Sequence, residues 1–210
     1  MNVVAVIADV VDSRGIPDRQ EFQRRLEALL GRISARSGRQ LLSPFTLTLG
    51  DEFQAVYGGF EAVLGDAVEI IAEVYPHRLR MAFGHGPLAT DLNPKAALGM
   101  DGPCFAAARE LVTRLKQEQR SIIQISAGEG IDLGLENLSL RLFAGAIEGW
   151  KRSSLVVLSR LLQGASTVEL VEELGISRRG VNKNIASHNI ADFVQLMRLL
   201  SARLPQVAPA

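Results

Sequence analysis

The chain has 210 residues, of which 47% are apolar and 22% charged, and its 23 basic residues balance 23 acidic ones. This is the composition of a globular protein with a real core. No stretch reaches the roughly 18 uninterrupted apolar residues of a membrane-spanning helix, so we predict a cytoplasmic protein with no membrane partner. A single cysteine, Cys104, excludes a disulfide framework and a zinc knuckle.

The first 130 residues predict alternating strands and helices. A compact apolar run over Val3–Ala8 predicts a buried strand, and Asp18 is a suitable N-cap for a helix that Gly38 ends. Two hairpin strands follow at 46–49 and 53–56, then a helix at 63–74 and a strand at 78–86. After a polar loop at 87–101 come a helix at 105–118 and a strand at 121–126. This order predicts an α/β (α+β) fold of ferredoxin-like type, an antiparallel sheet with helices on one face.

The last sixty residues differ from the rest in charge. Residues 1–150 carry 15 basic and 19 acidic residues, whereas residues 151–210 carry 8 basic and 4 acidic ones. Such a difference suggests two modules with different partners. We predict a first domain over 1–150, a small all-helical domain over 151–204 and a flexible tail over 205–210.

The segment "TVELVEELGISRRGVNKNIA" predicts a helix-turn-helix motif. Gly175 allows the sharp turn, and Ser177 can cap the second helix. The first turns of that helix, which would face the major groove of DNA, carry Ser177, Arg178, Arg179, Asn182 and Lys183. The alternative is a helical dimerisation or docking unit. Asn184 departs from the motif, because many such helices keep an apolar residue there. A last amphipathic helix over 190–204 is either core or the seam of a homodimer.

Two acidic residues are the candidate metal ligands. Asp9 ends the first strand, and Asp51 lies in the hairpin turn after Gly50. In a split β-α-β-β sheet the two strands concerned are neighbours, so both carboxylates project from the same end of the sheet. With the carbonyl of Val10 they would suit Mg²⁺, which takes oxygen ligands and often completes its shell with phosphates. The alternative is an ordinary acidic turn. Asp12 and Glu52 are weaker candidates, and Glu52 would point away from Asp51 because neighbouring strand side chains alternate.

Four segments, "AVIADVVDSR", "TLTLGDEFQAV", "RMAFGHGPL" and "DGPCFAAARELV", resemble the SatD family of bacterial proteins over about residues 1–130. That family is similar to class III nucleotidyl cyclases and GGDEF diguanylate cyclases. The resemblance implies a palm domain of nucleotidyl cyclase type, in which Asp9 and Asp51 hold metal ions.

The chain departs from those cyclases at two positions. Arg109 stands where class III cyclases keep an arginine, but Phe105 replaces their asparagine, and Leu49 replaces a glycine of the GGDEF signature. Arg109 could bind a phosphate by its bidentate guanidinium, and Arg14 could reach the same phosphate. The alternatives are that Arg109 pairs with a neighbouring acid and that Arg14 is solvent-exposed. His85 is expected as a satisfied strand histidine.

We predict a nucleotide- or metal-responsive DNA-binding regulator, in which the cyclase-like domain senses a phosphorylated ligand. The alternatives are a Mg²⁺-dependent enzyme acting on nucleoside triphosphates, a divergent nucleotidyl cyclase, and a non-enzymatic scaffold.

Overall fold

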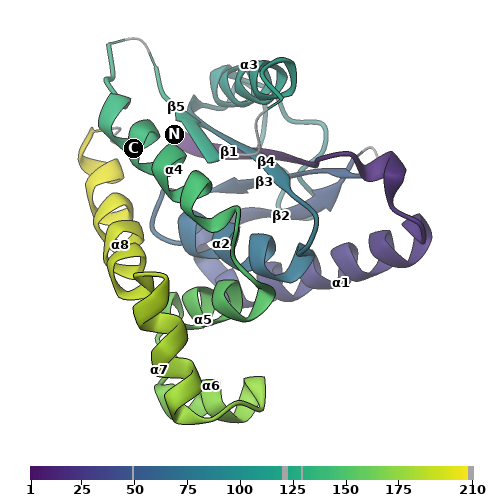
Figure 1. The fold of residues 1–210 in the computed structure, drawn as a ribbon. Coiled ribbons are helices and arrows are strands. Elements are labelled where there is room, and N and C mark those ends of the chain that lie inside the picture. Colours follow the sequence, from purple (N-terminus) through teal and green to yellow (C-terminus); the bar gives the residue numbers. More distant parts are fainter. Residues whose placement is uncertain (49, 120–122, 129, 208–210) are drawn as a thin grey trace.

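A five-stranded sheet forms the centre of the computed structural model, which describes residues 1–48, 50–119, 123–128 and 130–207 (Figure 1). Its strands are β1 (Asn2–Val10), β2 (Leu41–Leu47), β3 (Glu52–Tyr57), β4 (Leu79–Pro87) and β5 (Ile123–Ser126). They lie in the order β2-β3-β1-β4-β5; β1 is antiparallel to β3 and β4, and β5 is parallel to β4. The predicted α/β class and the ferredoxin-like order of the first four strands are confirmed.

Helices cover both faces of this sheet, so the prediction that they lie on one face is wrong. Helices α1 (Arg19–Ser37) and α2 (Val63–Val74) pack on one face, and α3 (Pro103–Gln117) packs on the other (Figure 1). The close approach of α3 needs Gly84 on β4, because a Cβ at this position would overlap the carbonyl oxygen of Cys104. β1 is therefore buried on both faces, as its continuous apolar run predicts.

The loop after β4 covers the rest of the face on which α3 packs. Ser43 of β2 donates a hydrogen bond to the carbonyl of Asn93, and Gln54 of β3 donates one to the carbonyl of Ala97. The Thr46 hydroxyl accepts from the backbone N–H of Ala97, 2.9 Å away. The predicted polar loop is thus fixed across the hairpin strands.

β2 begins at Leu41, five residues before its predicted start at Thr46. Pro44 lies within the strand and cannot donate to a ladder, but β2 is at the edge of the sheet, where proline is tolerated. The register of β2 against β3 shifts twice between Leu41 and Thr46. Leu49 and the start of the predicted strand at 121–126 lie outside the described residues.

The ends of α1 are as predicted. The Asp18 carboxylate accepts a hydrogen bond of 3.0 Å from the backbone N–H of Glu21, which caps the helix. Gly38 ends it with a φ of 55°, a left-handed value that favours glycine.

Five helices follow the sheet: α4 (Gly134–Ile147), α5 (Arg152–Leu162), α6 (Thr167–Leu174), α7 (Arg178–Ser187) and α8 (Ile190–Val207). α5 packs on α2 and α8, and one hydrophobic cluster runs from the sheet through Leu158 to Leu170, Val181 and Met197. A separate helix-turn-helix domain is therefore not confirmed, and the boundary after residue 150 stays a prediction. α8 contains Pro205 and takes up the first three residues of the predicted tail.

The helix-turn-helix segment has the local geometry that its residues predict. α6 ends at Gly175, whose φ is 62°, and the Ser177 hydroxyl accepts from the N–H of Gly180 at 3.1 Å. Asn184 accepts a 2.9 Å hydrogen bond from the buried hydroxyl of Ser154 on α5. This contact explains why a polar residue stands at a position where such motifs usually keep an apolar one.

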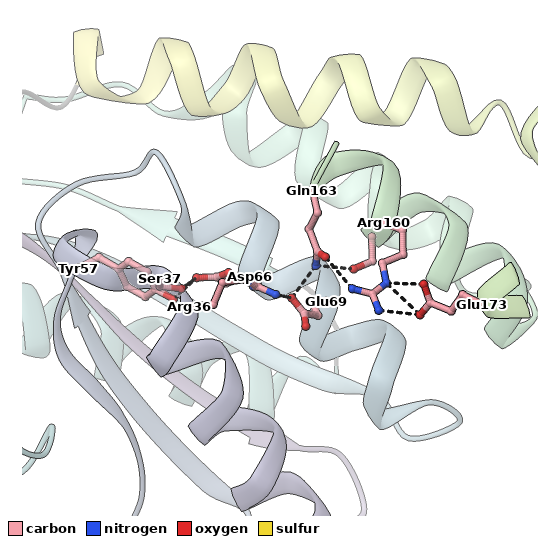
Figure 2. A network of polar contacts seen from close by, with 9 residues as sticks. Arg36, Ser37, Tyr57, Asp66, Glu69, Arg160, Gln163 and Glu173 are labelled. Carbon is pink, nitrogen blue, oxygen red and sulfur yellow. Dashed lines mark hydrogen bonds and ion pairs between the residues drawn. The ribbon is translucent and has the colours of Figure 1, made fainter. Parts of the chain in front are cut away.

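A polar network crosses from the sheet to the C-terminal helices (Figure 2). Asp66 of α2 is buried and accepts hydrogen bonds from the side chains of Arg36, Ser37 and Tyr57. Figure 2 shows the network continuing through Glu69, which Arg36 and the amide of Gln163 contact at 2.6 and 2.7 Å.

The network ends on the helix-turn-helix segment. Arg160 of α5 donates to Gln163 at 3.0 Å and to both carboxylate oxygens of Glu173 on α6, in a bidentate pair (Figure 2). Hydrogen bonds and ion pairs therefore connect β3 with α6. Within the described residues, no helix is both long and apolar enough to cross a membrane.

Candidate functional site

An acidic pair lies where β1 and β3 meet at one end of the sheet. The antiparallel register places Asp9 opposite Glu52, and β4 places Arg80 opposite Asp9 on the other side. Asp9 and Glu52 continue the side-chain row of Ile7 on β1 and Gln54 on β3, so they face α3. Both carboxylates are largely buried, with 5% and 7% of their residues exposed.

Three cations surround this pair. Arg109 Nη1 lies 2.7 Å from Glu52 Oε1, and Lys116 Nζ lies 3.4 Å from Asp9 Oδ2 and 3.6 Å from Glu52 Oε2. Arg80 Nη1 lies 3.2 Å from Asp9 Oδ2. Arg109 and Lys116 are seven residues apart on α3, two helical turns, and so reach the same face. We call these five residues the acid–base cluster.

The two carboxylate oxygens of Asp9 have different surroundings. Its Oδ2 faces both Arg80 and Lys116, but its buried Oδ1 has no hydrogen-bond partner among the described residues. Burial raises the pKa of Asp9 above its ordinary value, although the positive charges of Lys116 and Arg80 act to lower it. A buried oxygen without a partner is costly unless something binds it.

Asp51 lies at the same end of the sheet with different contacts. Its backbone carbonyl accepts a 3.2 Å hydrogen bond from the N–H of Val10, next to Asp9. Its carboxylate accepts a 2.6 Å hydrogen bond from Ser13 and lies 3.6 Å from Arg19 Nη2. The turn is fixed further by Gly50, whose φ is 70°. Glu52 and Asp51 thus point to different partners, as strand alternation predicts.

The two predicted phosphate-binding arginines are placed differently. Arg109 belongs to the acid–base cluster, where its guanidinium pairs with Glu52 and its side chain is 50% exposed. Arg14 is exposed in the short 3₁₀ helix η1 (Ser13–Gly15) and forms no side-chain hydrogen bond or ion pair with another described residue. Phe105 packs in the apolar cluster between α3 and the sheet, which accounts for the absence of an asparagine there.

The cluster contains two residues that the sequence did not single out as site residues, Arg80 and Lys116, and one, Glu52, that it marked only as a weaker candidate. For Lys116 the available signal was its seven-residue spacing from Arg109. Glu52 and Arg80 are set by strand register, which one sequence does not show.

Asp9 and Asp51 offer the oxygen donors that Mg²⁺ takes, but the two carboxylates lie in different surroundings: Asp9 faces α3, whereas Asp51 contacts Ser13 and Arg19. Within the described ranges, no group of three or more His, Cys, Asp or Glu side chains could hold a metal ion. A site completed by a ligand could use Oδ1 of Asp9, which has no partner among the described residues, and the carboxylate of Asp51. Mg²⁺ is often bound in this way, by one or two carboxylates plus phosphate oxygens.

Two further residues, the predicted strand histidine His85 and Gly102, have structural explanations. His85 is buried on β4 with its ring 5.6 Å from that of Phe60, and burial lowers its pKa, which favours the neutral form. Gly102 precedes α3 with a φ of 150°, and a Cβ there would meet the carbonyl of Pro87. Neither residue needs a ligand to explain it.

The predicted DNA-contacting residues lie together on one segment. Ser177, Arg178, Arg179, Asn182 and Lys183 are all exposed at the start of α7. α7 and the α7–α8 connection contain no acidic residue, and the next one along the chain is Asp192 in α8. The local charge is therefore positive.

The comparison with protein families matches the SatD family model over residues 3–191. The chain belongs to the SatD family. The predicted resemblance is therefore confirmed, and it extends beyond residue 130 into the C-terminal helices. The comparison with curated proteins gave no match.

Among solved structures, this SatD-family chain is similar to nucleotidyl cyclases. One is the catalytic core of a rhodopsin-guanylyl cyclase with converted specificity in complex with ATPαS, at 19% identity and a TM-score of 0.43, over 60% of this chain and 77% of that one. Another is a bacterial light-regulated adenylyl cyclase, at 16% identity and a TM-score of 0.41, over 60% of this chain and 43% of that one.

Proposed function

We propose that the end of the sheet bearing Asp9 and Asp51 binds a nucleoside triphosphate together with Mg²⁺, and that the protein is a Mg²⁺-dependent enzyme of divergent nucleotidyl cyclase type. The observation that carries the proposal is the buried Oδ1 of Asp9, which lacks a partner among the described residues, in a cluster that also contains two half-exposed cations of α3. A buried carboxylate with a perturbed pKa and specific charge partners is typical of functional sites.

Each residue of the site has a role in this proposal. Asp9 and Asp51 would hold Mg²⁺, which when bound neutralises phosphate charge and activates a hydroxyl. Arg109 and Lys116 would exchange their carboxylate partners for phosphate oxygens, since their side chains are 50% and 44% exposed and can move. Arg80 is only 12% exposed and would stay with Asp9, holding its carboxylate in place.

Thermal stabilisation by ATP or GTP with Mg²⁺ tests the binding step. We expect nucleotide and Mg²⁺ together to raise the unfolding midpoint of the wild type, because a ligand bound only by the folded state stabilises it. Asp9→Asn and Asp51→Asn should abolish this rise. Asp12→Asn is the matched control, since Asp12 is an exposed acid nearby whose φ of 54° asparagine tolerates. If the unfolding midpoints of Asp9→Asn and Asp51→Asn rise as much as that of the wild type, the proposed binding site is wrong.

Incubation with labelled triphosphates and Mg²⁺ or Mn²⁺ tests the chemistry. A cyclic or otherwise converted nucleotide that depends on Asp9 is the expected result. Binding without any product over a long incubation would leave a nucleotide sensor and exclude the enzyme.

A DNA-binding regulator is the second candidate, favoured by the exposed polar and basic residues on the first turns of α7. In this proposal Ser177, Arg178, Arg179, Asn182 and Lys183 contact DNA, and the protein binds as a homodimer, as helix-turn-helix proteins commonly do. Its affinity for genomic fragments should fall steeply with salt and should drop in Arg178→Ala and Arg179→Ala. Arg25→Ala, an exposed arginine on α1, should bind as the wild type does. Salt-independent binding would contradict this candidate.

A further inference from the structure

A cavity of about 350 Å³ lies between β4, α2 and α4, away from the acid–base cluster. Buried apolar side chains form much of its lining, among them Met81, Ile123, Phe143 and Leu155. Ligand sites are typically concave, largely apolar and about 300–1,000 Å³ in volume, so this cavity is at the small end of that range. None of the acid–base cluster residues lines it.

The polar part of the lining has an excess of positive charge. Arg78 and Glu148 neutralise each other across 3.2 Å. Arg141 of α4 also lines the cavity and has no ion-pair partner within the part of the chain that the structure describes. His77 is a further polar group of the lining. The charge that a ligand would meet is therefore that of Arg141.

We propose that this cavity binds a small amphipathic carboxylate. Its apolar body would fill the space against Met81 and Phe143, and its carboxylate would bind the guanidinium of Arg141, which suits a carboxylate by its two parallel donors. Such a ligand contacts α2 and α4 and also Leu155 of α5, so it connects the sheet with the C-terminal helices. This inference goes beyond the proposed nucleotide site and stands independently of it.

Gly145 offers a position at which a larger side chain is expected to narrow the cavity without a clash. Gly145 lines the cavity within α4, and a Cβ added there meets no atom within 4 Å. Gly145→Leu should therefore fill the space and also favour the helix. Gly31→Leu is the matched control: Gly31 is likewise helical and exposed, its Cβ also meets open space, and it lies on α1 outside the cavity.

Calorimetric titration of the full chain with 4-phenylbutyrate, and with the neutral 4-phenylbutyramide, tests the proposal. We expect 4-phenylbutyrate to bind the wild type and Gly31→Leu equally, and Gly145→Leu not at all. Arg141→Gln should weaken binding by about tenfold or more, the size of a charge-assisted hydrogen bond, and the amide should bind the wild type about as weakly.

Three results would overturn the inference: no binding of 4-phenylbutyrate to the wild type, equal affinity for acid and amide, or full binding to Gly145→Leu. A thermal melt of each variant without ligand shows whether it folds. Because ATP and Mg²⁺ do not enter this titration, its failure leaves the proposed nucleotide site unaffected.

Discussion

Two buried aspartates of this protein, Asp66 and Asp9, are equally inaccessible, each 5% exposed, but they are used differently. Asp66 accepts from Arg36 on one oxygen, at 2.7 Å, and from Ser37 and Tyr57 on the other, at 2.6 and 2.7 Å (Figure 2). Asp9 shares one oxygen between two cations at 3.2 and 3.4 Å and leaves the other without a partner among the described residues.

The comparison separates a structural carboxylate from a candidate functional one. Burial, and then the charge of Asp66, raises the pKa of Tyr57 well above its ordinary value, so Tyr57 stays a hydrogen-bond donor over the whole working range of pH. A fully satisfied polar group rigidifies a core, whereas a partly satisfied one needs an explanation such as an absent ligand.

Removing Asp66 should have the largest effect. Asp66→Ala leaves the buried Tyr57 hydroxyl without its acceptor and removes one of the two carboxylate partners of Arg36, and we expect it to lower the free energy of unfolding by about 3 kcal/mol. Denaturant titration measures the loss. Ser37→Ala removes only one donor and should cost about 1 kcal/mol. A loss below about 1 kcal/mol in Asp66→Ala would show that the network around Asp66 is not structural.

Glu136 sharpens the comparison, because it too is buried with one oxygen, Oε2, lacking a partner among the described residues. Its Oε1 accepts from Arg203 Nε at 2.5 Å, which ties α8 to the first turn of α4. Arg203→Ala should destabilise the protein by about 2 kcal/mol, since it leaves a buried charge unpaired. The double variant with Glu136→Gln should recover part of this loss; no recovery would mean that Arg203 acts through packing alone.

Asp9→Asn should behave in the opposite way to Asp66→Ala. The pKa of Asp9 is raised in the folded state, so its ionised form is disfavoured there and its contribution to stability grows as pH falls through that raised pKa. We expect Asp9→Asn to retain wild-type stability or exceed it at pH 7. The stability of the wild type relative to the variant should rise as the pH is lowered from 7 toward 3.8, the ordinary pKa of an aspartate. The unfolding free energies of both proteins across this range provide the measurement. A large loss of stability in Asp9→Asn at pH 7 would show that Asp9, like Asp66, is a structural carboxylate.

The smallest structural effect is expected at Arg109. Its ion pair with Glu52 is half exposed, and pairs of this kind contribute about 0–1 kcal/mol. Arg109→Gln should therefore change the unfolding midpoint little while weakening any stabilisation by nucleotide with Mg²⁺. Arg24→Gln, which removes an exposed pair with Glu21 on α1, is the matched control and should leave that stabilisation intact. Equal effects in the two variants would contradict a role for Arg109.

Local sequence signals predicted much of the fold. Apolar runs, the Asp18 cap, Gly38 and the Gly175–Ser177 turn act over a few residues, and the structure has each of them where expected. The position of α3 on the opposite face of the sheet could not be predicted in this way. It depends on Gly84, whose missing side chain admits a helix about twenty residues later in the chain.

The candidate site was predictable only in part, for the same reason. Asp9 and Asp51 are marked by their places at a strand end and in a turn. Glu52, Arg80 and Lys116 come to Asp9 from three other elements, β3, β4 and α3. The strand register and helix placement that bring them together are tertiary properties, and no periodicity within one segment encodes them.

The packing of α5 on α2 has a consequence for how the molecule opens. Val157 and Leu158 are fully buried in the same cluster as Val68 and Ile70, so the backbone amides of α2 and α5 should exchange their hydrogens with solvent at similar, slow rates. α6 and α7 bury one residue each, Leu170 and Val181, and should exchange much faster. The boundary that amide exchange detects would then fall after α5 rather than before it.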